Sequence, residues 1–216
     1  MKEKIDISQI RFKYKKNPLD IKNSDSNPFK QFNKWMNEAI KNKVFESTAM
    51  SLSTVNKSNN VSNRIVLLKG VENNSFIFYT NLKSRKSYEL NINKSVAAVF
   101  WWPQIGKQVR IEGYVKIINK GTADQYFSTR SRESQIAAWA SNQSSVVKNR
   151  KTLIKRFKII EKRFEKKDIL RPSFWSGYEI KPFLIEFWQG RENRLHDRII
   201  YKKINKKKWK KYRLNP

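Results

Sequence analysis

The segment with the densest set of chemically capable residues is 188–198, WQGRENRLHDR, which holds the only histidine of the chain, His196. Arg191, Arg194 and Arg198 fall within its last eight residues. Arginine is a planar, permanently charged fork that stacks on flat rings and grips oxyanions through two hydrogen bonds. On a strand or extended loop Arg194, His196 and Arg198 share one face. A lone histidine is usually structural, but one between two arginines pairs poorly with them unless an anion is present. The segment predicts a place for a flat, anionic molecule.

Two earlier clusters also combine cations with polar groups. Arg64 and Lys69 bracket the apolar segment 65–68 and, on one strand, would face opposite ways. They would then serve different parts of a ligand, unless a partner chain or a strand end brings them together. Residues 79–80 (Tyr-Thr) end a predicted strand, and residues 84–86 (Ser-Arg-Lys) open a helix. The N–H groups of a helix N-terminus, together with arginine and lysine, make a phosphate site. A solvated helix start explains the same pattern, so this cluster alone is weak evidence.

A third cluster comprises Tyr126, Arg130 and Ser134, with Gln143 and Ser144 beyond them. Tyr126 and Arg130 are four residues apart on a predicted helix and therefore share a face. A phenol, a guanidinium and a hydroxyl that converge can hold a second phosphate. Spacing alone favours a solvent-exposed arginine beside a half-buried tyrosine.

The sequence offers little acid–base or nucleophilic machinery. No pair of carboxylates forms an acid–base couple, and six glycines provide no phosphate-cradling loop. The lack of cysteine excludes disulfides, thiolate nucleophiles and cysteine-ligated zinc, and a single histidine excludes a histidine-rich metal site. Anion-binding groups without catalytic machinery favour chemistry supplied by a bound cofactor, for which the protein provides position and electrostatics.

The net charge of +29 on 216 residues is extreme. A basic surface attracts phosphate backbones, so a nucleic-acid-binding protein is one alternative. The lysines are dispersed, and asparagine and isoleucine are abundant. This pattern favours another origin for the charge, the bias toward lysine, isoleucine and asparagine that an AT-rich genome produces. Only residues 199–216 are locally extreme, with eight basic and no acidic residues. Within them, four residues are expected at buried strand positions beside a solvated lysine face: Ile199, Tyr201, Trp209 and Tyr212.

The apolar pattern predicts an amphipathic helix over 28–43, capped by Asn27 before Pro28. Strands are expected at 48–55, 63–69, 75–80, 96–102, 108–118, 174–180, 184–189, 198–203 and 208–213. Shorter helices are expected at 84–91, 122–129, 133–141 and 149–166. In the last of these, four apolar residues at helical spacing are assigned to the core: Leu153, Phe157, Ile160 and Phe164.

Many short antiparallel strands with inserted helices suggest a β-barrel of α+β type. Residues 1–20 are expected to form an arm and residues 21–216 a single domain. No run is long enough for a membrane span, and the N-terminus lacks the apolar core of a signal peptide. We therefore expect a soluble, cytoplasmic protein.

Six motifs, in order along nearly the whole chain, are RIVLLK, FYTNLKSRK, QVRIEG, SRESQIAAWASNQSS, RPSFWSGY and IEFWQGRENRLHDR. They resemble the motifs of the pyridoxamine 5'-phosphate oxidase family. The resemblance implies an FMN-binding split β-barrel and a homodimer, with two FMN molecules in clefts at the interface, each touched by both chains. It also implies oxidation of pyridoxamine or pyridoxine 5'-phosphate at C4' to pyridoxal 5'-phosphate. Hydride passes to flavin N5, and dioxygen reoxidises the flavin to give hydrogen peroxide.

The resemblance also assigns residues. Positions that match FMN ligands are Arg64, Ile65, Val66, Leu67, Leu68, Lys69, Tyr79, Thr80, Arg85, Lys86, Gln108, Gln143, Ser144, Trp188 and Arg198. Positions that match substrate ligands are Arg11, Tyr14, Lys69, Tyr126, Arg130, Ser134, Arg194 and His196. By the same resemblance Arg194 and His196 are catalytic: Arg194 orients the substrate and stabilises charge, and His196 orients it or accepts a proton. Arg11 and Tyr14 belong to an arm that closes the site.

Three residues depart from the family pattern: Ser131 and Glu192 stand where proline is common, and Ala137 stands where glycine is common. All three adjoin matching positions without replacing one. A flavoprotein of the same fold with another substrate and a basic nucleic-acid-binding protein are the remaining alternatives.

Overall fold

The computed structural model describes residues 7–9, 14, 18–205 and 208–216. Arg11 lies outside the described residues, whereas Tyr14 lies within them. The chain divides into two compact units, each assembled from separate stretches of sequence. Unit 1 contains residues 1–47, 101–110 and 184–216, and unit 2 contains residues 48–100 and 111–183. The arm over 1–20 and the single domain over 21–216 stay predictions.

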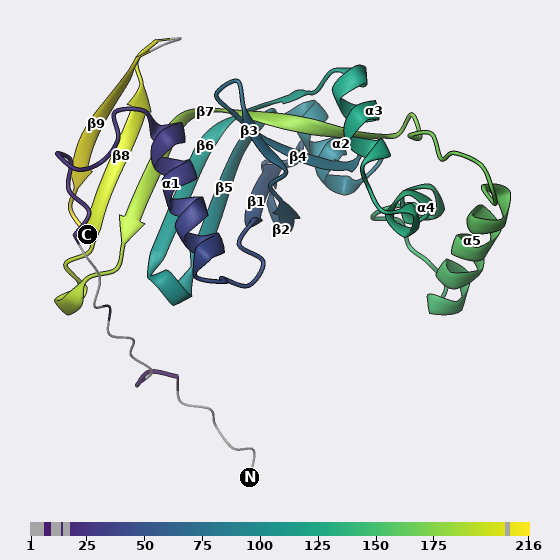
Figure 1. Cartoon of the computed structure of the whole chain (residues 1–216), viewed down its shortest axis with the longest axis horizontal. Helices are drawn as coiled ribbons and strands as arrows, with labels where there is room; N and C mark the ends of the chain where they lie inside the picture. Colours follow the sequence, from purple (N-terminus) through teal and green to yellow (C-terminus); the bar gives the residue numbers. More distant parts are fainter. Residues whose placement is uncertain (1–6, 10–13, 15–17, 206–207) are drawn as a thin grey trace. The chain divides into compact units, whose positions relative to one another are not determined.

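The described residues form nine strands whose hydrogen-bonding order is β2-β1-β5-β6-β7-β4-β3, with β8 paired to β7 and β9 paired to β8 (Figure 1). The strands are β1 (Ala49–Val55), β2 (Val61–Leu67), β3 (Gly70–Glu72), β4 (Ser75–Asn81), β5 (Ser95–Trp102), β6 (Lys107–Ile117), β7 (Trp175–Gln189), β8 (Asp197–Lys203) and β9 (Trp209–Leu214). The pairs β1–β2, β1–β5, β3–β4, β4–β7, β7–β8 and β8–β9 are antiparallel. The predicted strand series matches these strands, except that the structure adds β3 and joins the segments expected at 174–180 and 184–189 into the single strand β7.

The helices of the described part are α1 (Pro28–Lys41), α2 (Arg85–Ile92), α3 (Lys120–Ser128), α4 (Arg132–Ala140) and α5 (Arg150–Arg163), with short 3-10 turns η1 (Pro103–Ile105) and η2 (Glu192–Arg194). The start of α1 is as predicted. The Asn27 side chain accepts a hydrogen bond from the Phe29 N–H at 2.8 Å, and Pro28 occupies the first turn, where its missing N–H costs nothing.

Helix α1 lies beside the strands of unit 1 (Figure 1), and aromatic side chains pack between them. Trp35 meets Phe187 of β7 edge to face, with ring centroids 5.1 Å apart, and Phe187 meets Tyr201 of β8 at 5.4 Å. Phe32 lies 6.2 Å from Trp102. Because these rings are buried, they contribute apolar surface to the core of this unit.

The core of unit 2 includes a cluster of Phe127, Ile136, Ile169 and Trp175. Three residues of the predicted stripe pack against this cluster while remaining half-buried: Phe157 and Ile160 of α5, and Phe164, which follows the helix as its C-cap. Leu153 is 40% exposed, and no described residue of α5 is buried. The stripe faces the core, as predicted, but its residues are not buried in the core, because α5 packs on the outside of the cluster.

The strand expected to end at residue 180 and the one expected to begin at 184 are a single strand, β7. It pairs with β4 over 175–180 and with β8 over 184–189. Pro182 lies between these two sets of partners, so its missing N–H removes a bond to neither. Close to this point, a Cβ on Gly113 would lie 2.5 Å from the Lys181 carbonyl oxygen, so the backbone approach there requires glycine.

The expectation for the C-terminal hairpin is half right. Ile199 and Tyr201 are fully buried, but Tyr212 is exposed and Trp209 is only half-buried. Among the described strands β9 pairs with β8 alone, so it is an edge strand and its side chains are less buried than those of β8.

Candidate functional site

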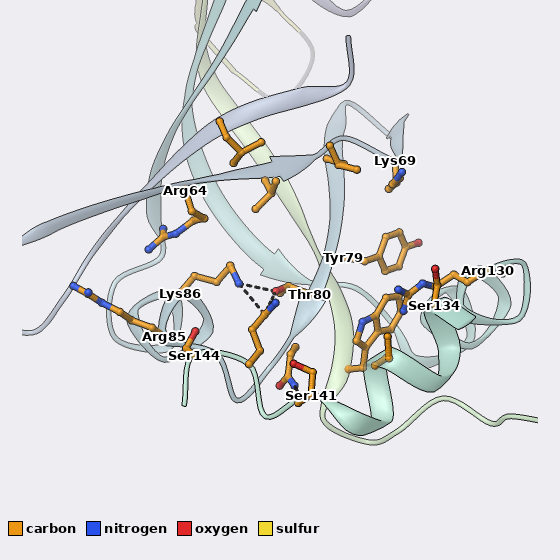
Figure 2. Close-up of a pocket in the computed structure, with 18 of the residues that line it drawn as sticks. Arg64, Lys69, Tyr79, Thr80, Arg85, Lys86, Arg130, Ser134, Ser141 and Ser144 are labelled. Atoms are coloured by element: carbon orange, nitrogen blue, oxygen red, sulfur yellow. Dashed lines mark hydrogen bonds between the residues drawn. The ribbon is translucent and has the colours of Figure 1, made fainter. Parts of the chain in front are cut away.

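A cavity of about 970 Å³ lies in unit 2, within the size range of small-molecule sites. Its lining comes from β2, β4, the first turn of α2, the α3–α4 region and the start of β7. Five cations line it: Arg64, Lys69, Arg85, Lys86 and Arg130 (Figure 2). The lining residues include no acidic side chain. The cavity is therefore suited to a ligand with more than one negative charge.

Lys86, in the first turn of α2, is buried at one end of the cavity, with an exposed fraction of 8%. Its ammonium donates a hydrogen bond to Thr80 Oγ1 at 3.0 Å (Figure 2). It also donates to Gln143 Oε1 at 3.0 Å and to Ser84 Oγ at 3.2 Å. Burial, and then the nearby Arg64, lower the pKa of Lys86 to about 8, with a partial offset from Glu89. All three hydrogen-bond acceptors are neutral, so a bound anion would stabilise the charged form.

Glu89 of α2 is 1% exposed and joins two cavity arginines. Arg64 Nη2 donates to Glu89 Oε2 at 3.2 Å, and Arg85 Nε donates to Glu89 Oε1 at 2.9 Å. Ser62 and Thr54 also donate to Glu89 Oε2. Burial raises the pKa of this carboxyl, but these hydrogen bonds outweigh it and lower the pKa to about 2. The buried anion therefore fixes the directions of both arginines.

The prediction that Arg64 and Lys69 face opposite sides of one strand is wrong. Strand β2 ends at Leu67, and Lys69 follows in the connection to β3, where its N–H donates to the Ile77 carbonyl at 2.8 Å. Strand alternation therefore does not govern Lys69, and both cations line the same cavity. Leu68 is buried with an exposed fraction of 6% and is absent from the lining, whereas Ile65, Val66 and Leu67 belong to it.

The other end of the cavity holds Arg130 and Ser134 (Figure 2), and Tyr126 also lines the cavity. Helix α3 ends at Ser128, so the expectation that Tyr126 and Arg130 share a helix face is wrong, although both line the cavity. The Arg130 guanidinium lies 4.7 Å from the centroid of the Trp175 ring. Its Nη1 is buried and has no hydrogen-bond partner among the described residues. Such an unpaired donor costs on the order of 1–3 kcal/mol, which an acceptor on a ligand would recover.

Burial lowers the pKa of Arg130, and the adjacent Tyr126 partly offsets this. Ser131, where the family pattern has proline, caps α4 by accepting from the Ser134 N–H at 3.3 Å. Its hydroxyl also lies 3.0 Å from Ser134 Oγ and donates to it. The departure at Ser131 therefore replaces a rigid helix start with a hydrogen-bonded one. Gln143 and Ser144 also line the cavity.

In unit 1, His196 lies beside Trp188, with ring centroids 4.6 Å apart. Its Nδ1 accepts a hydrogen bond from the Arg191 N–H at 3.0 Å. Burial, and then Arg194, lower the pKa of His196, and Asp197 partly opposes this. Because Nδ1 already acts as an acceptor, the neutral ring carries its proton on Nε2. The geometry therefore makes His196 a hydrogen-bond donor at Nε2.

Arg194 and His196 do not alternate along a strand, contrary to expectation. Arg194 ends η2 with a φ of 60°, after Asn193 with a φ of 54°. The left-handed conformation takes both residues out of extended backbone, so strand alternation does not relate Arg194 to His196. The Arg194 side chain is exposed.

Arg198 is half-buried and donates to Glu186 Oε1 at 2.8 Å, a bond that raises the pKa of Arg198 above its usual value. Glu186 is 2% exposed and also accepts from Arg110 Nη2 at 2.8 Å. Arg198 is therefore one of two cations that share a buried anion, and it is held in place as Arg64 and Arg85 are.

Tyr14 contacts both rings of this cluster edge to face, at 5.6 Å from Trp188 and 5.9 Å from His196. Two glycines make room for it. A Cβ on Gly190 would lie 2.5 Å from Tyr14 Cγ, and Gly106, with a φ of 59°, would bring a Cβ to 3.0 Å from Tyr14 Cδ1. Tyr14 therefore fits closely against Trp188, His196 and two glycines of unit 1. Gln108 of β6 belongs to the same unit.

Sequence reasoning missed three residues that organise these clusters: Glu89, Glu186 and Trp175. Glu89 follows Arg85 by four residues on a predicted helix, a spacing that could have revealed the pair. Glu186 and Trp175 lie in quoted motifs, but their partners come from distant strands and helices. The described residues contain no cluster of potential metal ligands. None of the helices in the described part is long and apolar enough to span a membrane.

Two family models match the chain. Residues 36–165 match the model described as pyridoxamine 5'-phosphate oxidase, and residues 175–216 match the pyridoxine 5'-phosphate oxidase C-terminal dimerisation region. Two curated relatives carry the name pyridoxine/pyridoxamine 5'-phosphate oxidase. The protein of Leptospira interrogans is 44% identical over 97% of this chain and 98% of its own length. The protein of Rubrobacter xylanophilus is 42% identical over 98% of this chain and 97% of its own length.

Solved structures show the same fold. PhzG from Burkholderia lata, crystallised with tetrahydrophenazine-1-carboxylic acid, superposes with a TM-score of 0.85 at 26% identity, covering 90% of this chain and 95% of its own. An FMN-binding protein related to pyridoxamine 5'-phosphate oxidase, from Nostoc punctiforme, superposes with a TM-score of 0.69 at 14% identity. The match covers 86% of this chain and 97% of that protein. These likenesses confirm the predicted α+β split β-barrel.

Proposed function

The chain belongs to the pyridoxine/pyridoxamine 5'-phosphate oxidase family and oxidises pyridoxine and pyridoxamine 5'-phosphates to pyridoxal 5'-phosphate, and we propose that FMN and dioxygen are its cofactor and acceptor. The observation that carries this proposal is the unit 2 cavity, which has cations at both ends and no acidic lining residue. Two phosphorylated molecules, cofactor and substrate, match two cationic ends.

The residues present fit FMN. Lys86 is buried with neutral acceptors only, and Arg64 and Arg85 are fixed beside it by Glu89, so a phosphate would find donors that are already positioned. The side chains of Ile65 and Leu67 are exposed, at 63% and 37%, and supply apolar wall for a flat ring.

The proposal places the other cofactor contacts at Val66, Lys69, Tyr79, Thr80, Gln143 and Ser144, which line the cavity of unit 2. Leu68, which is buried outside the lining, is assigned on the motif match alone. The proposal also assigns contacts to Gln108, Trp188 and Arg198 of unit 1, for which the motif match is the support. When bound, FMN supplies a flavin ring that accepts a hydride.

The substrate phosphate is assigned to the opposite end of the cavity. There Arg130 offers an unpaired buried N–H, and Tyr126, Ser134 and Lys69 offer further donors. Anchoring the substrate by its phosphate fixes the distance and orientation of the reacting carbon. Positioning of this kind can lower a barrier by up to about 7–11 kcal/mol in the best intramolecular systems.

In unit 1, we assign Arg194 to orienting the substrate and stabilising charge as hydride leaves. The geometry of His196 favours an orienting role over proton acceptance, because its Nδ1 is engaged and its Nε2 carries the proton. Arg11 and Tyr14 are proposed to close the site. The match to a dimerisation region supports a homodimer, and FMN at its interface is part of the proposal. A cytoplasmic location stays a prediction.

The test is turnover in air. Protein reconstituted with FMN should convert pyridoxamine 5'-phosphate to pyridoxal 5'-phosphate, followed by absorbance. Each mole of product should be accompanied by one mole of hydrogen peroxide and one of ammonia, with dioxygen and water consumed. Product without peroxide would contradict dioxygen as acceptor. Retained FMN without product would indicate another substrate. Salt-sensitive RNA binding without flavin retention would favour the nucleic-acid alternative.

A further inference from the structure

Trp175, the first residue of β7, contacts two side chains proposed to bind the substrate phosphate, Tyr126 and Arg130, and one proposed FMN contact, Tyr79. Its ring stacks with Tyr79, with centroids 5.3 Å apart and planes 9° apart, and with Tyr126 at 6.2 Å and 5°. The Arg130 guanidinium lies over it, 4.7 Å from the centroid. Tyr79 and Tyr126 also stack on each other at 3.8 Å. One indole is therefore shared by two phenols and a guanidinium at one end of the cavity.

The strand register explains how the rings come to lie parallel. Tyr79 of β4 pairs with Gly177 of β7, and Asn81 pairs with Trp175, so all four positions share one face of the sheet. Gly177 has no side chain, and a Cβ there would lie 2.9 Å from Tyr79 Cδ1. The glycine therefore leaves space for the Tyr79 ring beside Trp175.

The core holds Trp175 firmly. The residue is 6% exposed, and Phe127 meets its ring edge to face, with centroids 5.1 Å apart. Ile136 and Ile169 belong to the same buried cluster. An indole fixed by the core can in turn fix the flat groups that stack on it, because aromatic and cation–π contacts are directional.

This support matters because Arg130 has unmet hydrogen-bonding capacity. Its Nη1 is buried without a hydrogen-bond partner among the described residues, and a ring face does not replace an acceptor. The indole therefore holds the guanidinium by its face while leaving Nη1 available to an acceptor. Stacking on the same indole orients Tyr126, whose hydroxyl belongs to the same set of donors.

We propose that Trp175 is the positioning residue of the substrate-phosphate end, and that it sets the preference for phosphorylated over unphosphorylated substrate. This inference rests on the proposed function. Trp175 acts through Arg130 and Tyr126 and takes no part in the oxidation itself. Its loss should therefore change binding of the phosphate, and should leave kcat and flavin retention near their wild-type values.

The test uses FMN-loaded protein with Trp175→Leu and Trp175→Phe, the second of which keeps a flat ring. KM and kcat are measured for pyridoxamine 5'-phosphate, and Kd is measured for pyridoxal 5'-phosphate and for pyridoxal. Trp175→Leu should raise KM and the Kd of the phosphorylated compound about tenfold, as expected for loss of a buried cation–π contact and a ring stack. The Kd for pyridoxal should stay unchanged, and Trp175→Phe should fall between Leu and wild type.

Trp139 provides a matched control. Arg163 lies over its ring at 5.4 Å, in the same unit, but Trp139 does not line the cavity. Trp139→Leu should leave the ratio of the two Kd values unchanged. Equal weakening for pyridoxal and its phosphate, no change in Trp175→Leu, or a Phe variant no better than Leu would overturn the proposal.

The wild-type protein separates this inference from the proposed function. Phosphate-selective binding without turnover would contradict the function and leave the role of Trp175 standing. Turnover without a selective loss in the Trp175 variants would overturn the inference alone.

Discussion

Replacing Glu89 by glutamine should destabilise the protein by about 3 kcal/mol at pH 7. Burial raises the pKa of the Glu89 carboxyl, but hydrogen bonds from Ser62, Thr54, Arg85 and Arg64 outweigh it and hold the pKa at about 2 instead of 4.5. At about 1.4 kcal/mol per pKa unit, that difference corresponds to about 3 kcal/mol. Removing one partner of a buried ion pair typically costs a similar amount, about 3–5 kcal/mol.

The contribution of Glu89 to the free energy of unfolding should decrease as pH falls. The pKa of Glu89 is lowered on folding, so its contribution is complete above the unfolded value of about 4.5 and disappears as pH falls through about 2. Urea unfolding at a fixed protein concentration should show the wild-type advantage over Glu89→Gln shrinking by about 2 kcal/mol between pH 7 and pH 3. FMN retention should also weaken, because Arg64 and Arg85 lose their shared anchor.

Glu161→Gln is the matched control, since Glu161 is an exposed carboxylate on α5 of the same unit. It should change stability by no more than about 0.5 kcal/mol. The reasoning is refuted by a Glu89→Gln cost below about 1 kcal/mol at pH 7, or by a difference from wild type that does not change between pH 7 and pH 3.

Three further substitutions test the site. Arg194→Ala should lose far more turnover than bound flavin, and equal losses would assign Arg194 to the cofactor. Lys86→Ala should weaken FMN retention. In the wild-type apoprotein, FMN affinity should fall as pH rises through about 8, where Lys86 loses its proton, and a flat profile would contradict this assignment. Arg130→Ala should raise KM for pyridoxamine 5'-phosphate by roughly 10- to 100-fold with little change in kcat, as loss of charge-assisted hydrogen bonds implies. An equal rise in KM for pyridoxamine would refute it.

The sequence predicted local structure well where local chemistry decides it. Helix α1 begins where the Asn27 cap and Pro28 placed it, because both act within one turn. Strand limits were harder to predict, because pairing decides them. Lys69 was predicted within a strand, but β2 ends at Leu67. Two strands were predicted around Pro182, but β7 is continuous there because its pairing partner changes from β4 to β8.

The candidate residues were predictable from motifs, but the way in which they are held was not. Arg198 was expected to present its charge to a ligand, and the structure pairs it with the buried Glu186, 12 residues earlier in sequence. The Trp175 stack joins β4, β7 and the α3 region, so its partners lie far apart in sequence. Such long-range contacts leave no periodic signal in a single sequence, because they depend on tertiary packing.

The most direct test of the central claim is a crystal structure of the protein with FMN and pyridoxal 5'-phosphate. The account predicts one phosphate within hydrogen-bonding distance of Lys86 Nζ, and the other within hydrogen-bonding distance of Arg130 Nη1. Phosphates bound outside the unit 2 cavity, or both at one end of it, would contradict the account.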